Sequence, residues 1–497
     1  MTKLSCIMPV FKPNGNHLKQ AIESVLNNSF KDLELLILND SPDYIFDFEE
    51  FLKQFKDNRI KYFENSKNLG AGLSYTKLIN KAEGEYLAIC DHDDISTADR
   101  FVTQINYLDK HKDIDCVSGL AQVFEKANFV LGNKLNNCQI QKCLLNFMAV
   151  ILPTCMFRKT SLTRDEMFNS DYLKCSDYEF FSRRKDLKNH ILDKILIQYR
   201  LHDNNTTGFN DKDCISQTKQ IQQRNLQLSS DIKIKSALVC IAKDEDNYIN
   251  EWLDYHLKLG FDRIFVYCND WNWFIPTKYK ITNKVVKINF NGQKQQVPSY
   301  DDFIQKYYQD FDFACFIDID EFIVLHKWDN INDCLKHYTD VKALRLPIKT
   351  FGNNGLDSVC DNNYSVLNRF TKCRKVYEHI GKYIVNLMLC KNKFKFLDEN
   401  WFGKMPCVNP DKKMAYNSYY CMFINDDDSQ QPIELNHYIT KTWEEYFIRK
   451  SNSDVKKGIV NYNKDQILRA YCLINRNDFA NEIENTKALE FSKSEEK

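Results

Sequence analysis

Three acidic side chains crowd the end of an apolar run in the first half of the chain. Residues 86–90, YLAIC, have the composition of a buried strand, and Asp91, Asp93 and Asp94 follow at once. Their mutual repulsion would cost stability unless a cation or solvent screens the charges. Two carboxylates one residue apart can reach one cation where the backbone turns, and oxygen ligands favour Mg²⁺ or Mn²⁺. The pattern indicates a divalent metal site.

The same pattern occurs in the second half. Residues 313–325, FACFIDIDEFIVL, run from an apolar strand into Asp318, Asp320 and Glu321. Acidic residues after a strand often only cap the next helix, and Asp94 could do so. Two clusters in matching positions favour metal binding over that simpler interpretation.

Two other sites built from clustered carboxylates fit less well. An EF-hand loop needs a glycine at its sixth position and a glutamate at its twelfth, and neither cluster has them. Phosphatases of the haloacid dehalogenase type also place Asp-x-Asp after a strand. They favour Thr or Val two residues after the second Asp, where this chain has Ile95 and Phe322. We therefore expect a metal that keeps open positions for phosphate oxygens.

Short strands and helices alternate through the first third of the chain. The apolar periodicity predicts strands at 4–10, 32–40, 59–65 and 85–90 and helices at 16–28 and 72–84. This alternation is typical of a parallel sheet covered by helices on both faces. Ligands of such sheets bind beyond the carboxyl ends of the strands, where Asp40 and the Asp91 cluster would lie.

The alternation of predicted strands and helices is interrupted at residues 209–235 and begins again after them. Residues 209–235 are polar and rich in glutamine, and we interpret them as a linker helix. A strand predicted at 262–270 ends in Asn-Asp, as the earlier strand ends at Asp40. In each half an Asn-Asp pair, an Asp-x-Asp pair and a histidine, His202 or His437, follow in the same order at nearly the same separations.

This repetition predicts two copies of one architecture. We place the first domain at 1–208 and the second at 236–460. The linker helix at 209–235 joins them, and a charged C-terminal tail occupies 461–497.

The composition restricts the class of protein. The 497 residues exceed what one hydrophobic core usually supports, and 43% of them are hydrophobic. Lys plus Arg and Asp plus Glu each number 68, so no overall field recruits nucleic acid. No apolar stretch reaches about 18 residues, and the N-terminus lacks a signal-peptide core. The 18 cysteines are scattered without a Cys-x-x-Cys pair, which favours a reducing compartment.

Several segments of the first half resemble a known family. Residues 7–41 and 68–101 resemble the opening strands, helices and Asp-x-Asp (DxD) motif of family 2 glycosyltransferases, which have the glycosyltransferase A fold. LPTCMFRKTSL at 152–162 is similar to the acceptor-side segment, SDYEFFSRR at 176–184 to the catalytic-base segment, and YRLHDNNTT at 199–207 to the closing segment. The resemblance covers nearly the whole half.

This resemblance implies a donor site for a nucleoside diphosphate sugar. Asp91 and Asp93 would hold Mn²⁺ or Mg²⁺, and His202 would join the metal or the diphosphate. The implied nucleotide contacts are Asp40 toward the base and the backbone near Pro9 and Phe11 around the ribose.

The resemblance also implies a catalytic base. The family usually has Glu-Asp where this chain has Ser176-Asp177, and the second acid of that pair carries the role. Asp177 is therefore the candidate base, and the first domain is expected to invert the anomeric centre. The family usually has Pro where Ala98 stands, which should only loosen a helix start.

The second half resembles another branch, the family 92 and related family 2-like transferases. The similar segments are 241–270, 313–325 and 434–450. They imply a second glycosyltransferase A domain, whose catalytic base we do not assign. The implied metal positions are Asp318, Asp320 and His437, and the implied donor-binding positions are Lys243, Asp270 and Lys441.

Together these expectations describe a bifunctional α/β enzyme with two tandem glycosyltransferase A domains of Rossmann-like type. It would add two sugars in turn to a glycan or lipid-linked acceptor in surface polysaccharide, capsule or lipopolysaccharide synthesis. We expect a cytoplasmic protein that could associate peripherally with the inner face of a membrane. The alternative is one active domain, with the other half serving as an acceptor-binding or scaffolding module.

Overall fold

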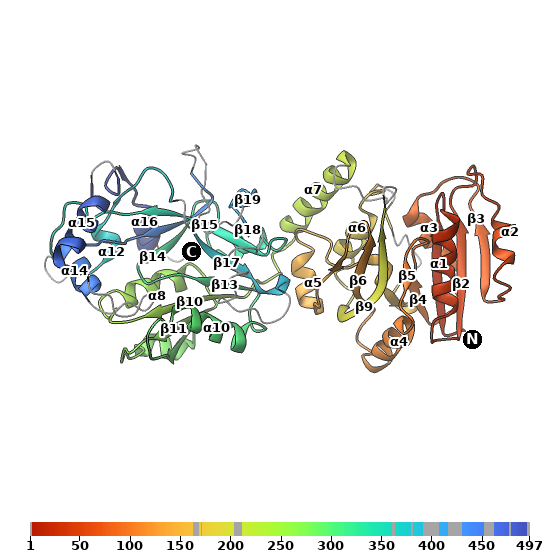
Figure 1. The fold of residues 1–497 in the computed structure, drawn as a ribbon, viewed down its shortest axis with the longest axis horizontal. Coiled ribbons are helices and arrows are strands. Elements are labelled where there is room, and N and C mark those ends of the chain that lie inside the picture. Colours follow the sequence, from red (N-terminus) through yellow and green to blue (C-terminus); the bar gives the residue numbers. More distant parts are fainter. Residues whose placement is uncertain are drawn as a thin grey trace. The chain divides into compact units, whose positions relative to one another are not determined.

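The chain folds into two units, Met1–Ile232 and Lys233–Lys497. The computed structural model describes residues 2–162, 168–169, 171–202, 211–359, 363–378, 381–390, 407–415, 430–451, 462–476 and 479–494. In Figure 1 the first unit runs from red to yellow-green and the second from green to blue. In the described part of the chain, no helix has both the length and the apolar character needed to cross a membrane.

The first unit is built on one mixed sheet. Its strands are β1 (Leu4–Val10), β2 (Leu33–Asn39), β3 (Ile60–Glu64), β4 (Tyr86–Ile89), β5 (Ile95–Ser96), β6 (Cys116–Glu125), β7 (Phe129–Leu131), β8 (Met156–Arg158) and β9 (Asn189–Leu201). They pair in the order β3-β2-β1-β4-β8-β6-β9-β5, and β7 pairs with β6. The four strands predicted from the apolar runs form a parallel block. The rest of the sheet differs from the expected all-parallel arrangement, because β8 runs antiparallel to both β4 and β6.

Helices pack on this sheet through their apolar faces. They are α1 (Gly15–Leu26), α2 (Phe48–Lys53), α3 (Ala71–Lys81), α4 (Arg100–Lys110), α5 (Asn137–Cys143), α6 (Ser176–Arg183) and α7 (Lys212–Gln227). Helix α1 begins at the N-cap Asn14, whose side chain accepts hydrogen bonds from the backbone of Asn16 and His17. It buries Leu18, Ile22 and other apolar residues against β1, β2 and β4 in one core. Such burial is what fixes short helices of this kind to a sheet.

The second unit contains a sheet of similar order. Its strands are β10 (Ser236–Ala242), β11 (Arg263–Cys268), β12 (Val285–Asn289), β13 (Phe313–Phe316), β14 (Glu321–Leu325), β15 (Ala343–Thr350), β17 (Gly381–Asn386), β18 (Cys407–Val408), β19 (Met414–Ala415) and β20 (Ile433–His437). The main path is β12-β11-β10-β13-β17-β15-β18-β19, and β20 pairs with both β14 and β15. A small separate sheet joins β16 (Lys372–Cys373) to β21 (Ile483–Glu484).

The helices of this unit are α8 (Ile249–Lys258), α9 (Thr277–Thr282), α10 (Gln296–Tyr307), α11 (Ile331–Lys336), α12 (Val366–Arg369), α14 (Trp443–Ser451), α15 (Lys464–Ile474) and α16 (Lys487–Lys493). Helix α8 follows the first strand of this unit, and helix α10 precedes its fourth strand. Helices α1 and α3 hold the same two places in the first unit.

The two sheets share one topology. In each, three parallel strands lead to a fourth, β4 or β13, which ends in the Asp-x-Asp motif. The short strand after the motif, β5 or β14, pairs antiparallel with a late strand, β9 or β20. That late strand in turn runs parallel to β6 or β15. The repeated order of motifs in the sequence thus corresponds to a repeated order of strands.

The segments outside the two sheets also pack on the units. Helix α7, expected as an interdomain linker, belongs to the first unit: Asn225 Nδ2 donates to Leu144 O at 2.6 Å and to Ser182 Oγ at 3.0 Å. The expected tail contains α15 and α16, and Ile467 and Tyr471 of α15 pack on Tyr446 of α14 in a small apolar cluster. The spacing of apolar residues within 461–497 is too irregular to predict this packing.

Candidate active site

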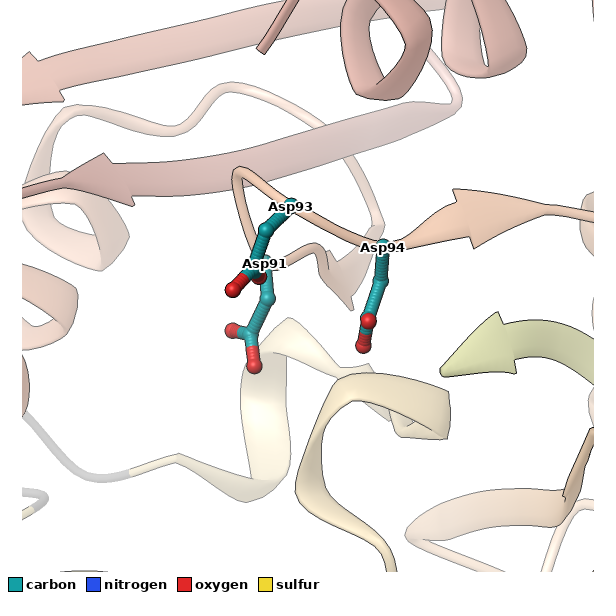
Figure 2. A group of neighbouring side chains, drawn as sticks. All are labelled: Asp91, Asp93 and Asp94. Atoms are coloured by element: carbon teal, nitrogen blue, oxygen red, sulfur yellow. The ribbon is translucent and has the colours of Figure 1, made fainter. Parts of the chain in front are cut away.

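The acidic cluster of the first unit lies on the turn between β4 and β5. Figure 2 shows Asp91, Asp93 and Asp94 with their carboxyl groups on the same side of this turn. One ligand oxygen from each lies within 4.8 Å of the others. Among the residues that the structure describes, this is the only group of three or more side chains placed to share a metal ion. The adjacent β4 is buried along its whole length, which fixes where the turn begins.

Two arginines hold this turn in shape. Arg200, on β9, donates from its backbone nitrogen to Asp94 Oδ1 and from Nε to the backbone oxygen of Asp93, both at 2.8 Å. Its guanidinium is anchored in turn by Glu125 and by Gln20. Arg100 donates from Nη2 to the backbone oxygen of Ile89 at 2.8 Å. Both arginines are almost fully buried, so the turn is positioned by the interior of the unit.

Burial and neighbouring charges raise the pKa of Asp91 and of Asp94. Burial and the charge of Asp93 raise the pKa of Asp91 to about 6, although the Tyr75 hydroxyl donates to Asp91. Burial and the charges of both neighbours raise the pKa of Asp94 well above its usual range. Asp94 Oδ2 is buried and accepts no hydrogen bond from the described part of the chain. A nearby cation would relieve both the repulsion and this unpaired oxygen.

His202 reaches the cluster from the end of β9. Its Nε2 lies 2.9 Å from Asp93 Oδ2. The ring of His17, on α1, lies 5.6 Å from the ring of His202 between centroids. The structure therefore places His202 beside Asp93. The remaining residues of its sequence segment, 203–207, lie outside the described residues.

Asp40 occupies the carboxyl end of β2 at the same edge of the sheet. Its backbone nitrogen donates to Val10 O at 2.8 Å. Its Oδ1 accepts hydrogen bonds from Asn65 Nδ2 and from the backbone of Leu69, both at 2.8 Å. Asp40 is only 2% exposed, so its position is fixed before any ligand arrives.

Pro9 and Phe11 lie at the end of β1. Pro9 is paired with Leu38 across the sheet, whereas the Phe11 side chain is exposed. Lys12 follows with a φ of 44° and donates from its backbone nitrogen to Ser41 Oγ at 2.9 Å. The exposed Phe11 ring lies under the Lys12 side chain, whose Nζ is 5.2 Å from the ring centroid.

Asp177 lies in the first turn of α6. Burial raises the pKa of its carboxyl, and Oδ1 accepts a hydrogen bond from the backbone of Tyr178 at 2.8 Å. Its charge makes a small contribution to the raised pKa of Asp91. The aromatic residues Phe180 and Phe181 of the same helix are fully buried.

The acidic pair of the second unit has cationic partners. Asp318 Oδ2 lies 2.9 Å from Lys382 Nζ, and Asp318 Oδ1 accepts a hydrogen bond from Gln296 Nε2 at 2.9 Å. Asp320 Oδ2 is paired with Arg449 and lies 3.8 Å from His437 Nε2. His437 therefore lies beside Asp320, but among the described residues Asp318, Asp320 and His437 do not form a group whose ligand atoms are close enough to share one metal ion.

Neighbouring charges decide the direction in which the pKa values of Asp320 and His437 are shifted. Burial would raise the pKa of Asp320, but Arg449 and His437 outweigh it and hold that pKa well below its usual range. Burial lowers the pKa of His437, and Asp320 reverses this to give a net increase. Asp320 and Arg449 therefore form a charged pair.

The implied donor contacts of the second unit lie at the carboxyl ends of β10 and β11 and after β20. Lys243 follows β10 and is partly exposed, and Asp270 follows β11 in an exposed position with a φ of 48°. Lys441 is buried, and its Nζ lies 3.6 Å from the centroid of the Tyr248 ring. Lys441 is thus held close to the site by a cation–π contact.

Four partners of the motif residues were not predicted from the sequence: Tyr75, Arg200, Lys382 and Arg449. Tyr75, Arg200 and Arg449 lie within segments that resemble the family, 68–101, 199–207 and 434–450, but no spacing rule connects them to the acidic residues that they contact. Lys382 lies outside all of these segments.

The first cluster has the donors that a hard divalent ion requires. It offers carboxylate oxygens from Asp91, Asp93 and Asp94 on one turn, and the unpaired Oδ2 of Asp94 faces no protein donor among the described residues. The residues present therefore fit Mn²⁺ or Mg²⁺.

Comparison with known proteins agrees with this geometry. Residues 5–165 match the model of glycosyl transferase family 2. An uncharacterized glycosyltransferase of Methanocaldococcus jannaschii is 29% identical over 206 residues, which cover 40% of this chain and 70% of that protein. An uncharacterized glycosyltransferase of Haemophilus influenzae is 26% identical over 271 residues, covering 50% of this chain and 83% of that protein.

Solved structures also align with about half of the chain. S. aureus TarS 1–349 in complex with UDP-GlcNAc aligns with a TM-score of 0.38 and 15% identity, covering 46% of this chain and 71% of that one. Mannosyltransferase PcManGT from Pyrobaculum calidifontis, in complex with GDP-Man and Mn²⁺, aligns with a TM-score of 0.32 and 9% identity, covering 46% and 75%.

The N-terminal region therefore contains a family 2 glycosyltransferase domain, and the chain is a glycosyltransferase. The prediction of two tandem α/β domains of the glycosyltransferase A type is confirmed.

Proposed function

We propose that the first unit transfers a sugar from a nucleoside diphosphate sugar to a hydroxyl group of a glycan or lipid-linked acceptor. The observation that carries this proposal is the convergence of Asp91, Asp93 and Asp94 on one turn beyond β4. In open α/β sheets this edge is where nucleotides bind. The transfer depends on Mn²⁺ or Mg²⁺.

Asp91 and Asp93 would hold the ion, and His202, which contacts Asp93, would lie beside them. When bound, the ion supplies positive charge that stabilises the leaving diphosphate. The ligand oxygens are positioned before the ion binds. Arg200 fixes the turn, and Asp94 Oδ2 offers a third carboxylate oxygen. Rigid positioning of this kind is what makes a weak ligand set effective.

Asp40 orients the nucleotide base, and the turn at Pro9 and Phe11 accommodates the ribose. The support for Asp40 is its fixed position at the end of β2, where Asn65 and Leu69 hold one of its oxygens. The support for Phe11 is an exposed ring at the end of the central strand.

Asp177 takes the proton of the acceptor hydroxyl as that oxygen attacks the anomeric carbon. Burial raises its pKa, which makes the carboxylate a stronger base than an exposed aspartate. Attack from the face opposite the diphosphate inverts the anomeric centre. The support for this role is the position of Asp177 in the segment 176–184, which resembles the catalytic-base segment of the family.

The second unit carries out a second transfer, and its sequence resembles family 92 and related transferases. The support is its matching topology, which places Asp318, Asp320 and His437 where the first unit has Asp91, Asp93 and His202. Lys243, Asp270 and Lys441 contact its donor. Two successive additions of this kind suit surface polysaccharide, capsule or lipopolysaccharide synthesis at the inner face of a membrane.

Release of nucleoside diphosphate tests the first proposal. The full chain is incubated with a panel of nucleoside diphosphate sugars and Mn²⁺, and released nucleotide is measured for wild type, Asp93→Asn and Asp113→Asn. Asp113 is an exposed aspartate outside the cluster and serves as the matched control. We expect Asp93→Asn to lower release of at least one donor by about 10²-fold, because a developing charge loses its stabilisation. Equal release by wild type and Asp93→Asn with every donor would contradict the proposal.

The alternative is that the second unit only binds the acceptor or acts as a scaffold. It is favoured by the ion pairs that already occupy Asp318 and Asp320. Two donors released by wild type, one of them insensitive to Asp93→Asn, would exclude it.

A further inference from the structure

The two acidic pairs differ in what neutralises them. In the first unit Asp91, Asp93 and Asp94 gather on one turn, and one carboxyl oxygen has no partner in the described part of the chain. In the second unit both motif aspartates have cationic side chains at ion-pair distance, Lys382 for Asp318 and Arg449 for Asp320. Among the residues described, the same strand order therefore carries carboxylates without cationic side chains at Asp91 and Asp94, and ion-paired carboxylates at Asp318 and Asp320.

Lys382 is placed by β17, next to β13 in the sheet. Its Nζ lies 2.9 Å from Asp318 Oδ2 and 3.3 Å from Glu321 Oε2. The other oxygen of Asp318 is taken by Gln296. A divalent ion would have to displace both partners to be bound by Asp318, so this carboxylate does not fit as a free metal ligand.

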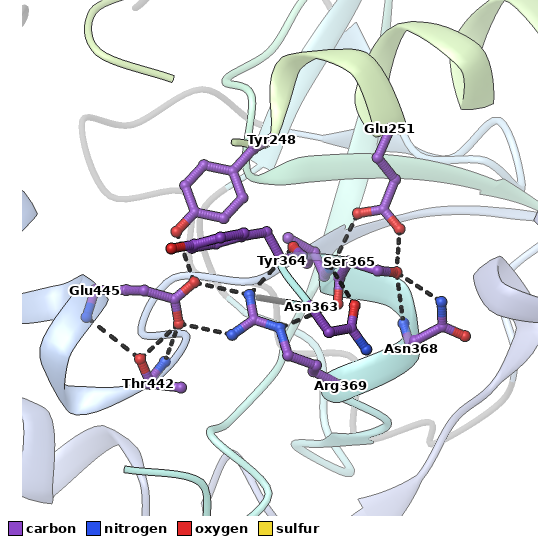
Figure 3. Close-up of polar contacts among 10 residues, drawn as sticks. Tyr248, Glu251, Asn363, Tyr364, Ser365, Asn368, Arg369, Thr442 and Glu445 are labelled. Atoms are coloured by element: carbon purple, nitrogen blue, oxygen red, sulfur yellow. Dashed lines mark hydrogen bonds and ion pairs between the residues drawn. The ribbon is translucent and has the colours of Figure 1, made fainter. Parts of the chain in front are cut away.

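Arg449 is delivered by the last part of α14. The helix begins with a capping box in which Glu445 N donates to Thr442 Oγ1 at 3.3 Å, and Thr442 N donates to Glu445 Oε2 at 2.9 Å. Arg369 donates to both oxygens of Glu445, and the Tyr248 hydroxyl donates to Oε1 (Figure 3). Two turns beyond Thr442, Arg449 reaches Asp320.

The Arg449 side chain is accessible to solvent, whereas its ion-pair partner Asp320 is buried. Its side chain is 36% exposed, whereas that of Asp320 is 5% exposed. Lys441, from the segment that leads into α14, adds a further positive charge beside the Tyr248 ring. Burial and the charges of Asp318 and Asp320 raise the pKa of Glu245, and the charges of Lys441 and Arg449 oppose that rise.

We propose that the second unit binds the diphosphate of a nucleoside diphosphate through Arg449 and Lys382, in place of a divalent metal ion. This inference rests on the proposed function of that unit as a donor site. A guanidinium fork matches phosphate oxygens in two parallel hydrogen bonds, and Lys supplies a compact point charge. Asp318 and Asp320 then act as positioning residues that hold the two cations, rather than as metal ligands.

The number of Mn²⁺ ions bound provides the first test. Free Mn²⁺ is measured by electron paramagnetic resonance in the presence of UDP, GDP, CDP or ADP, using the full chain. We expect one ion per chain in wild type, loss of that ion in Asp93→Asn, and no change in Asp320→Asn. Two ions per wild-type chain, or loss of an ion in Asp320→Asn, would overturn the proposal.

Binding of the nucleotides without metal provides the second test. Titration calorimetry in EDTA uses the full chain carrying Asp93→Asn, so that the first site does not contribute. We expect saturable binding of at least one of the four nucleotides and an affinity about tenfold lower after Arg449→Gln, the loss of roughly one charge-assisted hydrogen bond. Arg469→Gln, at an exposed arginine of α15, is the matched control and should bind unchanged.

Two results would overturn the inference and separate it from the proposed function. Binding that appears only after Mn²⁺ is added would leave the second unit as a donor site but refute its metal independence. Absence of binding under both conditions would refute the donor site as well. Since Arg449→Gln leaves the buried Asp320 with His437 as its remaining ion-pair partner, Lys382→Gln is measured in parallel and should also weaken binding. Tryptophan emission confirms that each variant is folded.

Discussion

Replacing Glu445 by Gln should destabilise the second unit selectively. Glu445 and Arg369 form a two-point ion pair in which each side chain is 7% exposed, and Tyr248 and Thr442 add further hydrogen bonds to the same carboxylate (Figure 3). The substitution keeps the shape of the side chain and removes its charge. It therefore leaves a buried guanidinium without a counter-charge.

The pKa of Glu445 gives the size of the effect. Burial raises this pKa, but the hydrogen bonds from Arg369, Thr442 and Tyr248 outweigh it and lower the value from 4.5 to about 2. A pKa that is lower by about 2.5 units in the folded state, at about 1.4 kcal/mol per unit, corresponds to about 3 kcal/mol of unfolding free energy. Because the folded-state pKa is the lower one, this stability is present above about pH 4.5 and is lost as the pH falls toward 2.

Tryptophan fluorescence isolates the unit concerned, because all six tryptophans lie between residues 252 and 443. In urea at pH 7 we expect Glu445→Gln to lower the unfolding free energy reported by this signal by about 3 kcal/mol. Glu444→Gln, at the exposed neighbouring position, should change it by less than about 0.5 kcal/mol. Equal midpoints for Glu445→Gln and Glu444→Gln at unchanged slope would refute the reasoning.

Three further predictions concern the first unit. Asp177→Asn should leave nucleotide affinity within a few-fold of wild type while turnover falls by about 10²- to 10⁴-fold, and calorimetry with steady-state kinetics measures the two separately. Arg200→Gln should weaken Mn²⁺ binding by about 10- to 100-fold because the turn loses its support; unchanged affinity in a metal titration would show that Arg200 is dispensable. Gly84→Ala would place a Cβ 2.5 Å from Ser5 N and should cost about 1–3 kcal/mol in calorimetric unfolding of this unit, with no effect on tryptophan fluorescence.

The central strands of both units could be predicted because fully buried strands are continuous runs of apolar residues in the sequence. The run SALVCIA at 236–242 is a strand with every residue buried, and the first four strands of the first unit lie within two residues of the expected bounds. The repeated order of motifs also predicted the repeated topology. Strands buried on both faces read as continuous apolar runs, and this signal is local.

The partners of the acidic residues could not be predicted in the same way. Lys382 and Arg449 lie far along the chain from Asp318 and Asp320, and their meeting depends on how β17 and α14 are placed. The polar, glutamine-rich segment at 209–235 predicts a helix but not its partners, which include the contacts of Asn225 with Leu144 and Ser182. Polar packing of this kind has no periodic signature.

Product analysis tests most directly the central claim that the two units transfer sugars independently. The full chain is incubated with a mixture of nucleoside diphosphate sugars, Mn²⁺ and labelled saccharide acceptors, and the products are resolved by mass spectrometry. We predict two mass increments with wild type, loss of one in Asp177→Asn, and loss of the other in Asp320→Asn. Loss of the same single increment in both variants would contradict the account.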